Sequence, residues 1–339
     1  GNCRPLSECL RLQVQASMFS RNPSQKMLRD NRCRSSRRSP LYCCLPRTSL
    51  SPRPDHVAFP DEKLGNVVFP DEMPRKDVTT SYSQCGRSPA KFGTRNTAQT
   101  TKPGDFPWLA AVGRLRSHQF KSICGGTLIT DRHVLSAAHC FLDSPIVWNP
   151  PTHVRLGEHN LLSDGDGAQD YQIIDERTKD YDQVTTSNDI ILLKLGRTVI
   201  FNGRISPACL PFRLSEGEYI HNHLTTVGWG LSTESNQRSL VPLQEHPQHV
   251  LLGECQQKYR KYTSGRQITD KNICAGRGGA DSCKGDSGGP LNFQSRSGRK
   301  AVYVVGIVSF GPSMCGNSKL PGVYTNVASY EHWIRSNLT

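Results

Sequence analysis

The chain has 339 residues, 13 cysteines and a formal net charge of +13. Because domains usually run to roughly 100–200 residues, this length suits one large domain and a smaller module. The sequence has no apolar run of the ~18 residues that a membrane-spanning helix needs. Its cysteines form no zinc-type pair of CxxC motifs, and their number favours an oxidising compartment over the cytosol. We therefore expect a secreted, extracellular protein from which any secretion signal has been removed.

Residues 1–54 are strongly basic and rich in cysteine. They contain eleven basic and two acidic side chains, a net charge of +9, and five cysteines. Because they have few aromatic residues, disulfides must replace much of a hydrophobic core, which predicts a small disulfide-rich domain. Such a charge could attract a polyanion or an anionic microbial surface, although most basic clusters are solvated without a dedicated partner. No motif supports nucleic-acid binding.

Residues 55–95 are rich in Pro, Asp, Ser and Thr, which predicts an exposed linker. Residues 96–339 instead show short strand-like runs separated by Gly, Pro, Asn and Asp, a pattern typical of an antiparallel barrel or sandwich. Clear examples are residues 122–129, 302–309 and 322–327. Only residues 328–338 have the apolar spacing of an amphipathic helix. We expect a mainly β domain that is closed by a C-terminal helix.

Three segments of this β domain carry the residue types of nucleophilic catalysis. His139 lies among small residues beside Cys140, Asp189 leads an apolar strand, and Ser287 lies in the turn Gly-Asp-Ser-Gly-Gly-Pro. A serine hydroxyl is a weak nucleophile, so His139 would act as its base and Asp189 would orient the imidazole. The glycines leave the N–H groups of Gly285 and Ser287 open to an oxyanion. Each residue alone has an ordinary structural explanation, but the combination predicts a catalytic triad.

The segments around His139, Asp189 and Ser287 resemble the three signatures of the chymotrypsin-like serine proteases, and they have the chain order of that family. The resemblance runs from about residue 96 to the C-terminus and includes Phe106-Pro107-Trp108, Cys124-Gly125-Gly126, Gly228-Trp229-Gly230 and Pro321-Gly322-Val323-Tyr324. It implies a double antiparallel β-barrel with a C-terminal helix, chemistry that requires no cofactor, and cleavage of protein substrates.

The resemblance also implies how the cysteines pair. In the β domain the implied disulfides are Cys85–Cys209, Cys124–Cys140, Cys255–Cys274 and Cys283–Cys315. Residues 1–54 are similar to the clip domain, a six-cysteine module of arthropod extracellular proteases, through Cys3, Cys9, Cys33, Cys43 and Cys44. This similarity implies that Cys3 pairs with Cys33 and Cys9 with Cys44, and that the missing cysteine would precede residue 1. An N-terminally trimmed module and an intermolecular role for Cys43 both stay open.

Substrate preference follows from the same resemblance. Asp281 stands six residues before Ser287, where the family has the carboxylate of its primary pocket. Gly311 and Gly322 match the small residues of the pocket wall. A buried carboxylate needs a cationic partner, so an Arg or Lys side chain of a protein substrate would bind there. The alternative is a surface aspartate that caps a turn.

An acidic, glycine-spaced loop begins at Gly157 and resembles the calcium loop of some trypsin-like proteases. Oxygen ligands suit this hard cation, and Glu158 and Asp170 are the predicted ligands of a structural Ca²⁺. The spacing departs from that of the family, and solvated acidic loops are common.

Activation is where the sequence departs most from the family. Family members are cleaved after Arg or Lys, and the new N-terminus, typically Ile-Val-Gly-Gly, pairs with the carboxylate before the catalytic serine, here Asp286. This chain lacks that tetrapeptide, and alignment on the Pro-Trp motif places cleavage after Arg95. The new N-terminus, Asn96, is polar and suits an apolar pocket less well than isoleucine. Cleavage after Lys91 would give an apolar start with about four extra residues; we favour Arg95.

Two functions follow from these residues. The first is the zymogen of a trypsin-like protease of an extracellular cascade such as clotting, melanisation or another immune pathway, for which the resemblance implies an upstream activating protease and a serpin-type inhibitor. The second is a non-catalytic homologue that acts as a binding cofactor. Such homologues usually lack the catalytic serine, so the presence of His139, Asp189 and Ser287 favours the enzyme.

Overall fold

The computed structural model describes residues 3–5, 41–43, 85–90, 92, 98–117, 119–143, 149–163, 167–219, 224–231, 237–260, 266–276, 285–296, 300–311 and 320–338. The chain divides into two units, Gly1–Asp71 and Glu72–Thr339, which are described separately. In the first unit, β1 (Cys3–Pro5) pairs antiparallel with β2 (Leu41–Cys43), and the backbone of Cys3 lies opposite that of Cys43. The predicted disulfides Cys3–Cys33 and Cys9–Cys44 are not tested, because Cys9, Cys33 and Cys44 lie outside the described residues.

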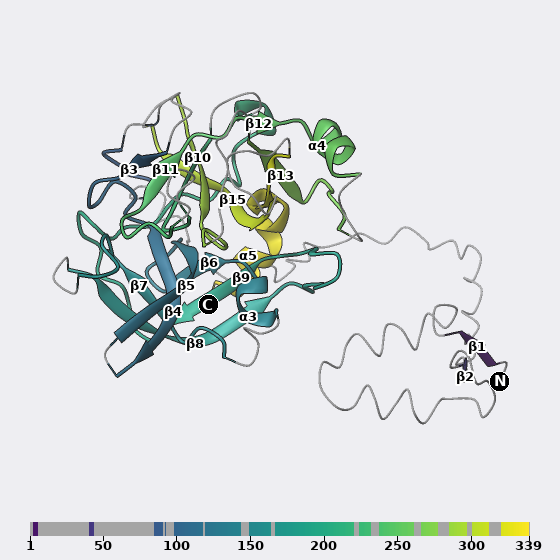
Figure 1. The fold of residues 1–339 in the computed structure, drawn as a ribbon, viewed down its shortest axis with the longest axis horizontal. Coiled ribbons are helices and arrows are strands. Elements are labelled where there is room, and N and C mark those ends of the chain that lie inside the picture. The colour runs from purple at the N-terminus through teal and green to yellow at the C-terminus, as the bar shows by residue number, and fades with distance from the viewer. Residues whose placement is uncertain are drawn as a thin grey trace, which may run out of the picture. The chain divides into compact units, whose positions relative to one another are not determined.

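The second unit begins with a closed six-stranded barrel, drawn in blue and teal in Figure 1. Its hydrogen-bonded order is β4-β5-β6-β9-β8-β7. The strands are β4 (Leu109–Arg116), β5 (Gln119–Leu128), β6 (His133–Ser136), β7 (His153–Leu156), β8 (Gln169–Thr178) and β9 (Ile191–Leu195). Runs of Ala, Val, Leu and Ile keep most of β4, β6 and β9 buried, because these side chains remove apolar surface from water.

The second half of this unit is an eight-stranded antiparallel sheet, mainly green and yellow in Figure 1. Its order is β12-β13-β16-β15-β14-β10-β11-β3. The strands are β3 (Gln99–Thr100), β10 (Thr225–Gly228), β11 (Leu243–Glu245), β12 (His249–Val250), β13 (Asn272–Ala275), β14 (Pro290–Gln294), β15 (Val302–Phe310) and β16 (Gly322–Asn326). The mainly β prediction is confirmed. The resemblance implies two barrels. Within the described residues, the first is a closed barrel, and the strands of the second are hydrogen-bonded as this eight-stranded sheet.

Trp108 joins the barrel to the sheet. Its side chain is fully buried just before β4, and its Nε1 donates a hydrogen bond of 3.0 Å to Oδ1 of Asn292 in β14. The Asn292 amide donates in turn to the Thr225 carbonyl, at 2.9 Å. Because an unpaired buried polar group costs free energy, these bonds fix how the two layers pack.

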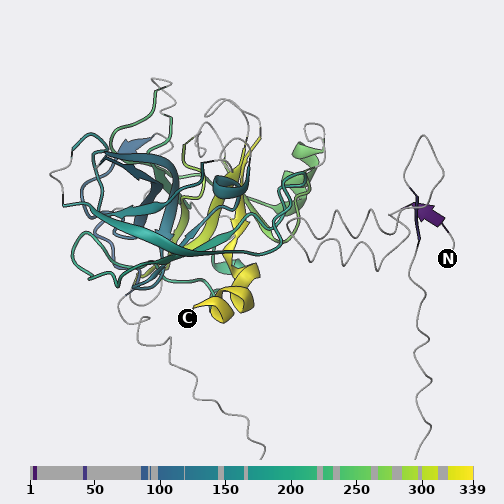
Figure 2. The same ribbon diagram turned by 90° about the horizontal axis from the view of Figure 1, so that it is seen from below.

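Helices are few and short. The chain ends in a 3₁₀ turn, η5 (Val327–Tyr330), and α5 (Glu331–Asn337), which agrees with the helix predicted at residues 328–338 (Figure 2). The other described helices are α3 (His139–Leu142), α4 (Leu252–Tyr259) and the 3₁₀ turn η4 (Glu216–Glu218). None of the helices described is long and apolar enough to cross a membrane.

Three disulfides are present among the described cysteines: Cys85–Cys209, Cys124–Cys140 and Cys255–Cys274. They are three of the four pairs that the resemblance implies for the β domain. The fourth pair, Cys283–Cys315, lies outside the described residues. Cys85–Cys209 fastens the segment before the barrel to the sheet, where the backbone N–H of Val302 also donates to the Gly86 carbonyl at 2.9 Å.

Candidate active site

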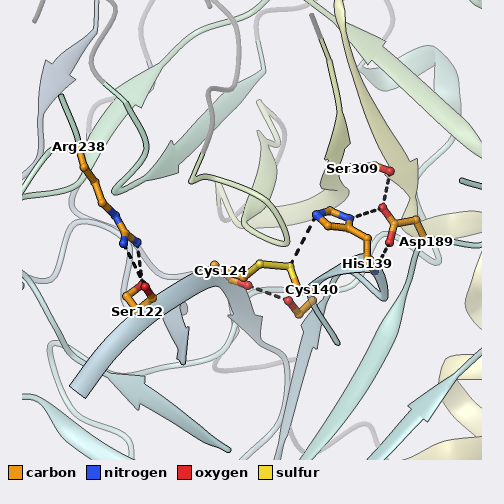
Figure 3. The surroundings of a disulfide bond; sticks show 9 residues. Ser122, Cys124, His139, Cys140, Asp189, Arg238 and Ser309 are labelled. Atoms are coloured by element: carbon orange, nitrogen blue, oxygen red, sulfur yellow. Dashed lines mark hydrogen bonds and ion pairs between the residues drawn. A yellow bond between two sulfur atoms is a disulfide. The ribbon is translucent and has the colours of Figure 1, made fainter. Parts of the chain in front are cut away.

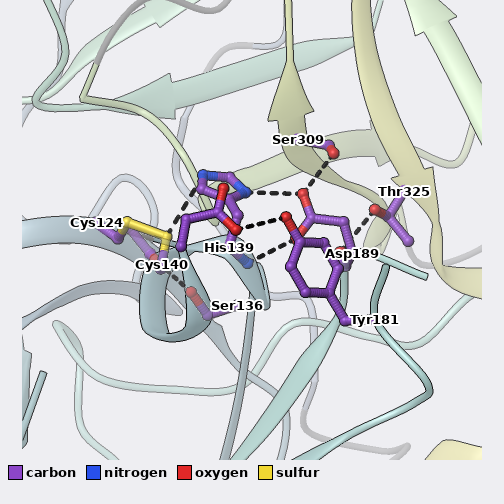
Figure 4. A network of polar contacts seen from close by, with 10 residues as sticks. Cys124, Ser136, His139, Cys140, Tyr181, Asp189, Ser309 and Thr325 are labelled. Atoms are coloured by element: carbon purple, nitrogen blue, oxygen red, sulfur yellow. Dashed lines mark hydrogen bonds and ion pairs between the residues drawn. A yellow bond between two sulfur atoms is a disulfide. The ribbon is translucent and has the colours of Figure 1, made fainter. Parts of the chain in front are cut away.

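The pairing of β6 with β9 brings His139 and Asp189 together. Ser136, at the end of β6, lies opposite Ile191, at the start of β9, so the residues just beyond them meet at one end of the barrel. There His139 Nδ1 lies 2.8 Å from Asp189 Oδ2, and the His139 backbone N–H donates to Oδ1 at 2.9 Å (Figure 4). Two bonds from one residue fix the carboxylate against the imidazole.

The sheet supplies two more partners for Asp189 that sequence reasoning missed. The hydroxyl of Ser309, near the end of β15, donates to Asp189 Oδ2, and the hydroxyl of Thr325 in β16 donates to the Asp189 backbone carbonyl at 2.7 Å (Figure 4). Asp189 is only 1% exposed. In the sequence, Ser309 is visible only as a serine that ends the apolar run 302–309. That position does not indicate that its partner is Asp189. Asp189 is thus held from the barrel and from the sheet.

The electrostatics of His139 and Asp189 favour a protonated imidazole next to a carboxylate. Burial opposes charge on both groups. The charge and hydrogen bond of Asp189 outweigh it for His139 and raise its pKa above the usual 6.5. In the same way, His139 and the Ser309 hydroxyl lower the pKa of Asp189. The imidazole is therefore a stronger base than a free histidine, as general-base catalysis requires.

The turn that carries Ser287 packs against the histidine turn. The Gly125 N–H donates to the Ser287 carbonyl at 2.7 Å. Gly288 has a φ of +79°, and a Cβ there would meet the Gly125 carbonyl oxygen at 2.6 Å and would also collide with the Ser136 hydroxyl. Only glycine permits this close approach. The structure thus brings the predicted nucleophile next to the segment that leads into His139.

In the described part of the chain, His139 Nε2 and Ser287 Oγ form no hydrogen bond with each other. The polar contact recorded for Nε2 is Cys140 Sγ, at 3.8 Å (Figure 3). Catalytic hydrogen bonds are often long before substrate binds and then tighten. Cys124, His139 and Cys140 also have the composition of a metal site, but the two sulfurs are bonded to each other and cannot act as thiolate ligands.

The backbone of Gly285 and Ser287 is open to a ligand. Neither N–H donates a hydrogen bond to any residue that the structure describes. Gly285 has a φ of +107°, a conformation that side chains other than hydrogen rarely allow. Two unused donors on either side of Asp286 are the arrangement expected for binding an oxyanion.

The Asp286 carboxylate lies directly against two glycines, Gly228 and Gly230. The Gly230 N–H donates to Asp286 Oδ1 at 2.8 Å. A Cβ on Gly230 would meet the carboxyl carbon at 2.5 Å, and one on Gly228 would also collide with the carboxylate. The motif Gly-Trp-Gly therefore holds the Asp286 carboxylate. The N-terminus predicted to pair with it on activation, Asn96, and the two candidate cleavage sites, Arg95 and Lys91, lie outside the described residues.

The predicted pocket is described only in part. Asp281 lies outside the described residues. Gly311 follows β15 directly and Gly322 begins β16, and the pairing of Phe310 with Val323 makes these two glycines neighbours at one end of the strands. They occur beside Ser309, which contacts Asp189. The two predicted wall glycines therefore lie near the predicted triad residue Asp189.

Comparison with known proteins agrees with this geometry. A family model described as Trypsin matches residues 96–334. The chain belongs to the trypsin family of clip-domain serine proteases. It is 35% identical to the CLIP domain-containing serine protease HP8 of Bombyx mori, over 100% of this chain and 91% of the relative. It is 34% identical to Melanization protease 1 of Drosophila melanogaster, over 86% and 74%, and 31% identical to the Proclotting enzyme of Tachypleus tridentatus, over 100% and 87%.

The two predicted calcium ligands of this trypsin-family chain, Glu158 and Asp170, form ion pairs with an arginine of the same chain, Arg155. Arg155 Nε and Nη2 donate to the two oxygens of Asp170 at 2.7 and 2.9 Å, and its Nη1 donates to Glu158 Oε2 at 3.2 Å. The other Glu158 oxygen accepts from the His159 N–H. Each of the four carboxylate oxygens therefore already accepts a hydrogen bond within the protein. The guanidinium between the two carboxylates disfavours Ca²⁺ there, because it offsets one of their two negative charges and repels a second cation.

Replacing Arg155 with glutamine is expected to lower the free energy of unfolding by about 3 kcal/mol, because buried Glu158 would lose its guanidinium partner. Urea unfolding followed by tryptophan fluorescence measures this change. Arg177→Gln removes the exposed pair with Asp175 and is the control, with an expected change below about 1 kcal/mol. In the unchanged protein, millimolar Ca²⁺ and a chelator should give the same unfolding midpoint; a midpoint raised by Ca²⁺ would contradict this account.

Proposed function

We propose that the protein is the secreted zymogen of a serine endopeptidase that cleaves protein substrates after Arg or Lys. The observation that carries the proposal is the buried Asp189–His139 pair, with its raised imidazole pKa, beside the glycine turn of Ser287. Names of relatives such as the melanization protease and the proclotting enzyme support a role in an extracellular cascade. In such a cascade an upstream protease activates the chain and a serpin-type protein inhibits it.

The proposed reaction uses each residue in turn. Ser287 Oγ attacks the carbonyl carbon of the cleaved bond while His139 Nε2 takes its proton, and Asp189 stabilises the imidazolium. The N–H groups of Gly285 and Ser287 bind the oxyanion. His139 then gives its proton to the leaving amine, and a water molecule repeats the sequence to release the acid and restore Ser287. Asp281 would bind the Arg or Lys side chain that precedes the cleaved bond.

The polar residue predicted at the new N-terminus, Asn96, favours a second candidate, a homologue that binds partners without cleaving them. In that case the basic residues 1–54 would bind a polyanionic or microbial surface, and the protease fold would act as a scaffold. The presence of all three triad residues, two of them bonded to each other, favours the enzyme.

One experiment separates the two candidates. The purified chain is treated with a trypsin-like protease, the new N-terminus is sequenced, and hydrolysis of an arginine-terminated chromogenic peptide is measured. We expect cleavage after Arg95 and hydrolysis that Ser287→Ala abolishes. The same treatment of Ser287→Ala controls for the activating protease. Cleavage after Arg95 or Lys91 without any Ser287-dependent hydrolysis would overturn the enzyme and favour the binding cofactor.

A further inference from the structure

An exposed arginine lies at the edge of the candidate active site. The guanidinium carbon of Arg266, between α4 and β13, is 4.9 Å from the centre of the Phe310 ring. Phe310 follows Ser309, whose hydroxyl binds Asp189, and precedes Gly311 of the predicted pocket wall. The Tyr259 ring packs against the same Phe310 ring in an edge-to-face arrangement, with the centroids 6.0 Å apart. Phe310 is thus a fixed platform that places Arg266 beside the catalytic centre.

Among the residues that the structure describes, no carboxylate pairs with Arg266. Arg266 forms no ion pair or hydrogen bond with any residue that the structure describes. Other arginines differ: Arg155 binds two carboxylates, and Arg238 donates to the carbonyl and hydroxyl of Ser122 and to the Trp229 carbonyl (Figure 3). Stacking on an aromatic ring leaves the five N–H donors at the rim of a guanidinium available. The N–H donors of the Arg266 guanidinium are therefore available to bind a carboxylate of a ligand.

The charge of Arg266 reaches the catalytic groups. It opposes protonation of His139 and lowers the pKa of that imidazole, against the larger effect of Asp189. The charge of Arg266 also lowers the pKa of Tyr181, against the larger effect of burial, which raises it. The Tyr181 hydroxyl donates to Asp143 Oδ1 at 2.9 Å (Figure 4). On the barrel side of the candidate site, the carboxylate of Asp143 is thus hydrogen-bonded to Tyr181. On the sheet side, the guanidinium of Arg266 stacks on the Phe310 ring.

We propose that Arg266 and Phe310 form a specificity subsite that binds an acidic side chain of the substrate, within a few residues of the Arg or Lys at the cleaved bond. The inference rests on the proposed protease function. A substrate segment that crosses Phe310 would place its side chains against the ring, and a carboxylate there would pair with the guanidinium in a bidentate manner. Because the site is exposed and screened by salt, the expected preference is modest, roughly five-fold in kcat/KM.

The test uses the activated full chain and peptide anilides that end in arginine. Glu, Gln or Lys is placed at each neighbouring position in turn. We expect wild type to prefer Glu over Gln by roughly five-fold at one position, and the preference to disappear near 1 M salt, where the Debye length falls to about 3 Å. Arg266→Gln should remove the preference, and Arg266→Glu should replace it with a preference for Lys.

Arg335→Gln is the matched control, because Arg335 also lies 4.9 Å from an aromatic ring, that of Phe212, but is paired with Glu331 on α5. It should keep the wild-type preference. A blocked single-arginine ester, which cannot reach the subsite, is measured well above the pKa of His139, where the imidazole is neutral in every variant. There all variants should hydrolyse the ester at similar rates, which shows that they are folded and active. If Arg266→Gln keeps the Glu preference, or if wild type has no such preference, the subsite is overturned. Ester hydrolysis that depends on Ser287 would in that case still support the protease function. No Ser287-dependent ester hydrolysis would overturn both.

Discussion

Replacing Asp189 with asparagine is expected to lower kcat/KM of the activated protein by about 10⁴-fold. The carboxylate accepts three hydrogen bonds, from the backbone N–H of His139, from His139 Nδ1 and from the Ser309 hydroxyl. An amide has only one accepting oxygen. If its NH₂ group faces Nδ1, the imidazole must carry its proton on Nε2 and cannot accept the Ser287 proton. If it faces the backbone N–H instead, two donors collide.

Hydrolysis of an arginine anilide as a function of pH measures this effect. In wild type the acidic limb of kcat/KM should have its midpoint above pH 6.5, because Asp189 raises the pKa of His139 and activity requires the neutral imidazole. In Asp189→Asn the residual activity should have its midpoint at lower pH, since the stabilising charge is gone. Ser309→Ala keeps the carboxylate and should lose far less activity. An Asp189→Asn protein with more than a tenth of wild-type activity would contradict the proposed role of Asp189.

Replacing Asp286 with asparagine is expected to lower kcat of the cleaved protein by at least about 10²-fold, the effect of losing one oxyanion donor. Asparagine keeps an oxygen for the Gly230 N–H but has no charge to hold a new α-ammonium group. Without that pairing the turn is not fixed, and the donors of Gly285 and Ser287 on either side of residue 286 are no longer held in place.

Single-turnover acylation of the cleaved variant, with its N-terminus verified by sequencing, measures this second effect. Because the loss concerns the transition state, kcat should fall much more than KM rises. Asp180→Asn is the control, since Asp180 is exposed and pairs only with Lys179 among charged residues described. Equal kcat in Asp286→Asn and wild type would show that the oxyanion donors are formed without the Asp286 carboxylate.

The contrast between Glu158 and Asp189 shows where sequence reasoning fails. Both are buried carboxylates next to glycine-rich or apolar segments. Asp189 is predicted from the residue types of nucleophilic catalysis, whereas Glu158 is predicted as a ligand by resemblance alone. Asp189 is hydrogen-bonded to His139, the histidine that the sequence pattern predicts as its partner. Glu158 and Asp170 meet Arg155, which the sequence analysis did not consider, although it lies only three residues before Glu158. A strand pattern shows which residues are buried, but not which cation lies between two carboxylates.

Local features of the sequence determined much of this protein. Short strand-like runs bounded by Gly, Pro, Asn and Asp indicate strands, an apolar spacing of three to four indicates the terminal helix, and a glycine-rich turn carries Ser287, because each depends on a few neighbouring residues. Tertiary structure decided the partners across the barrel and the sheet. Ser309 binds Asp189 across 120 residues of chain, and Arg266 stacks on Phe310 from a separate segment. Such contacts depend on how whole strands pack, which no short stretch of sequence specifies.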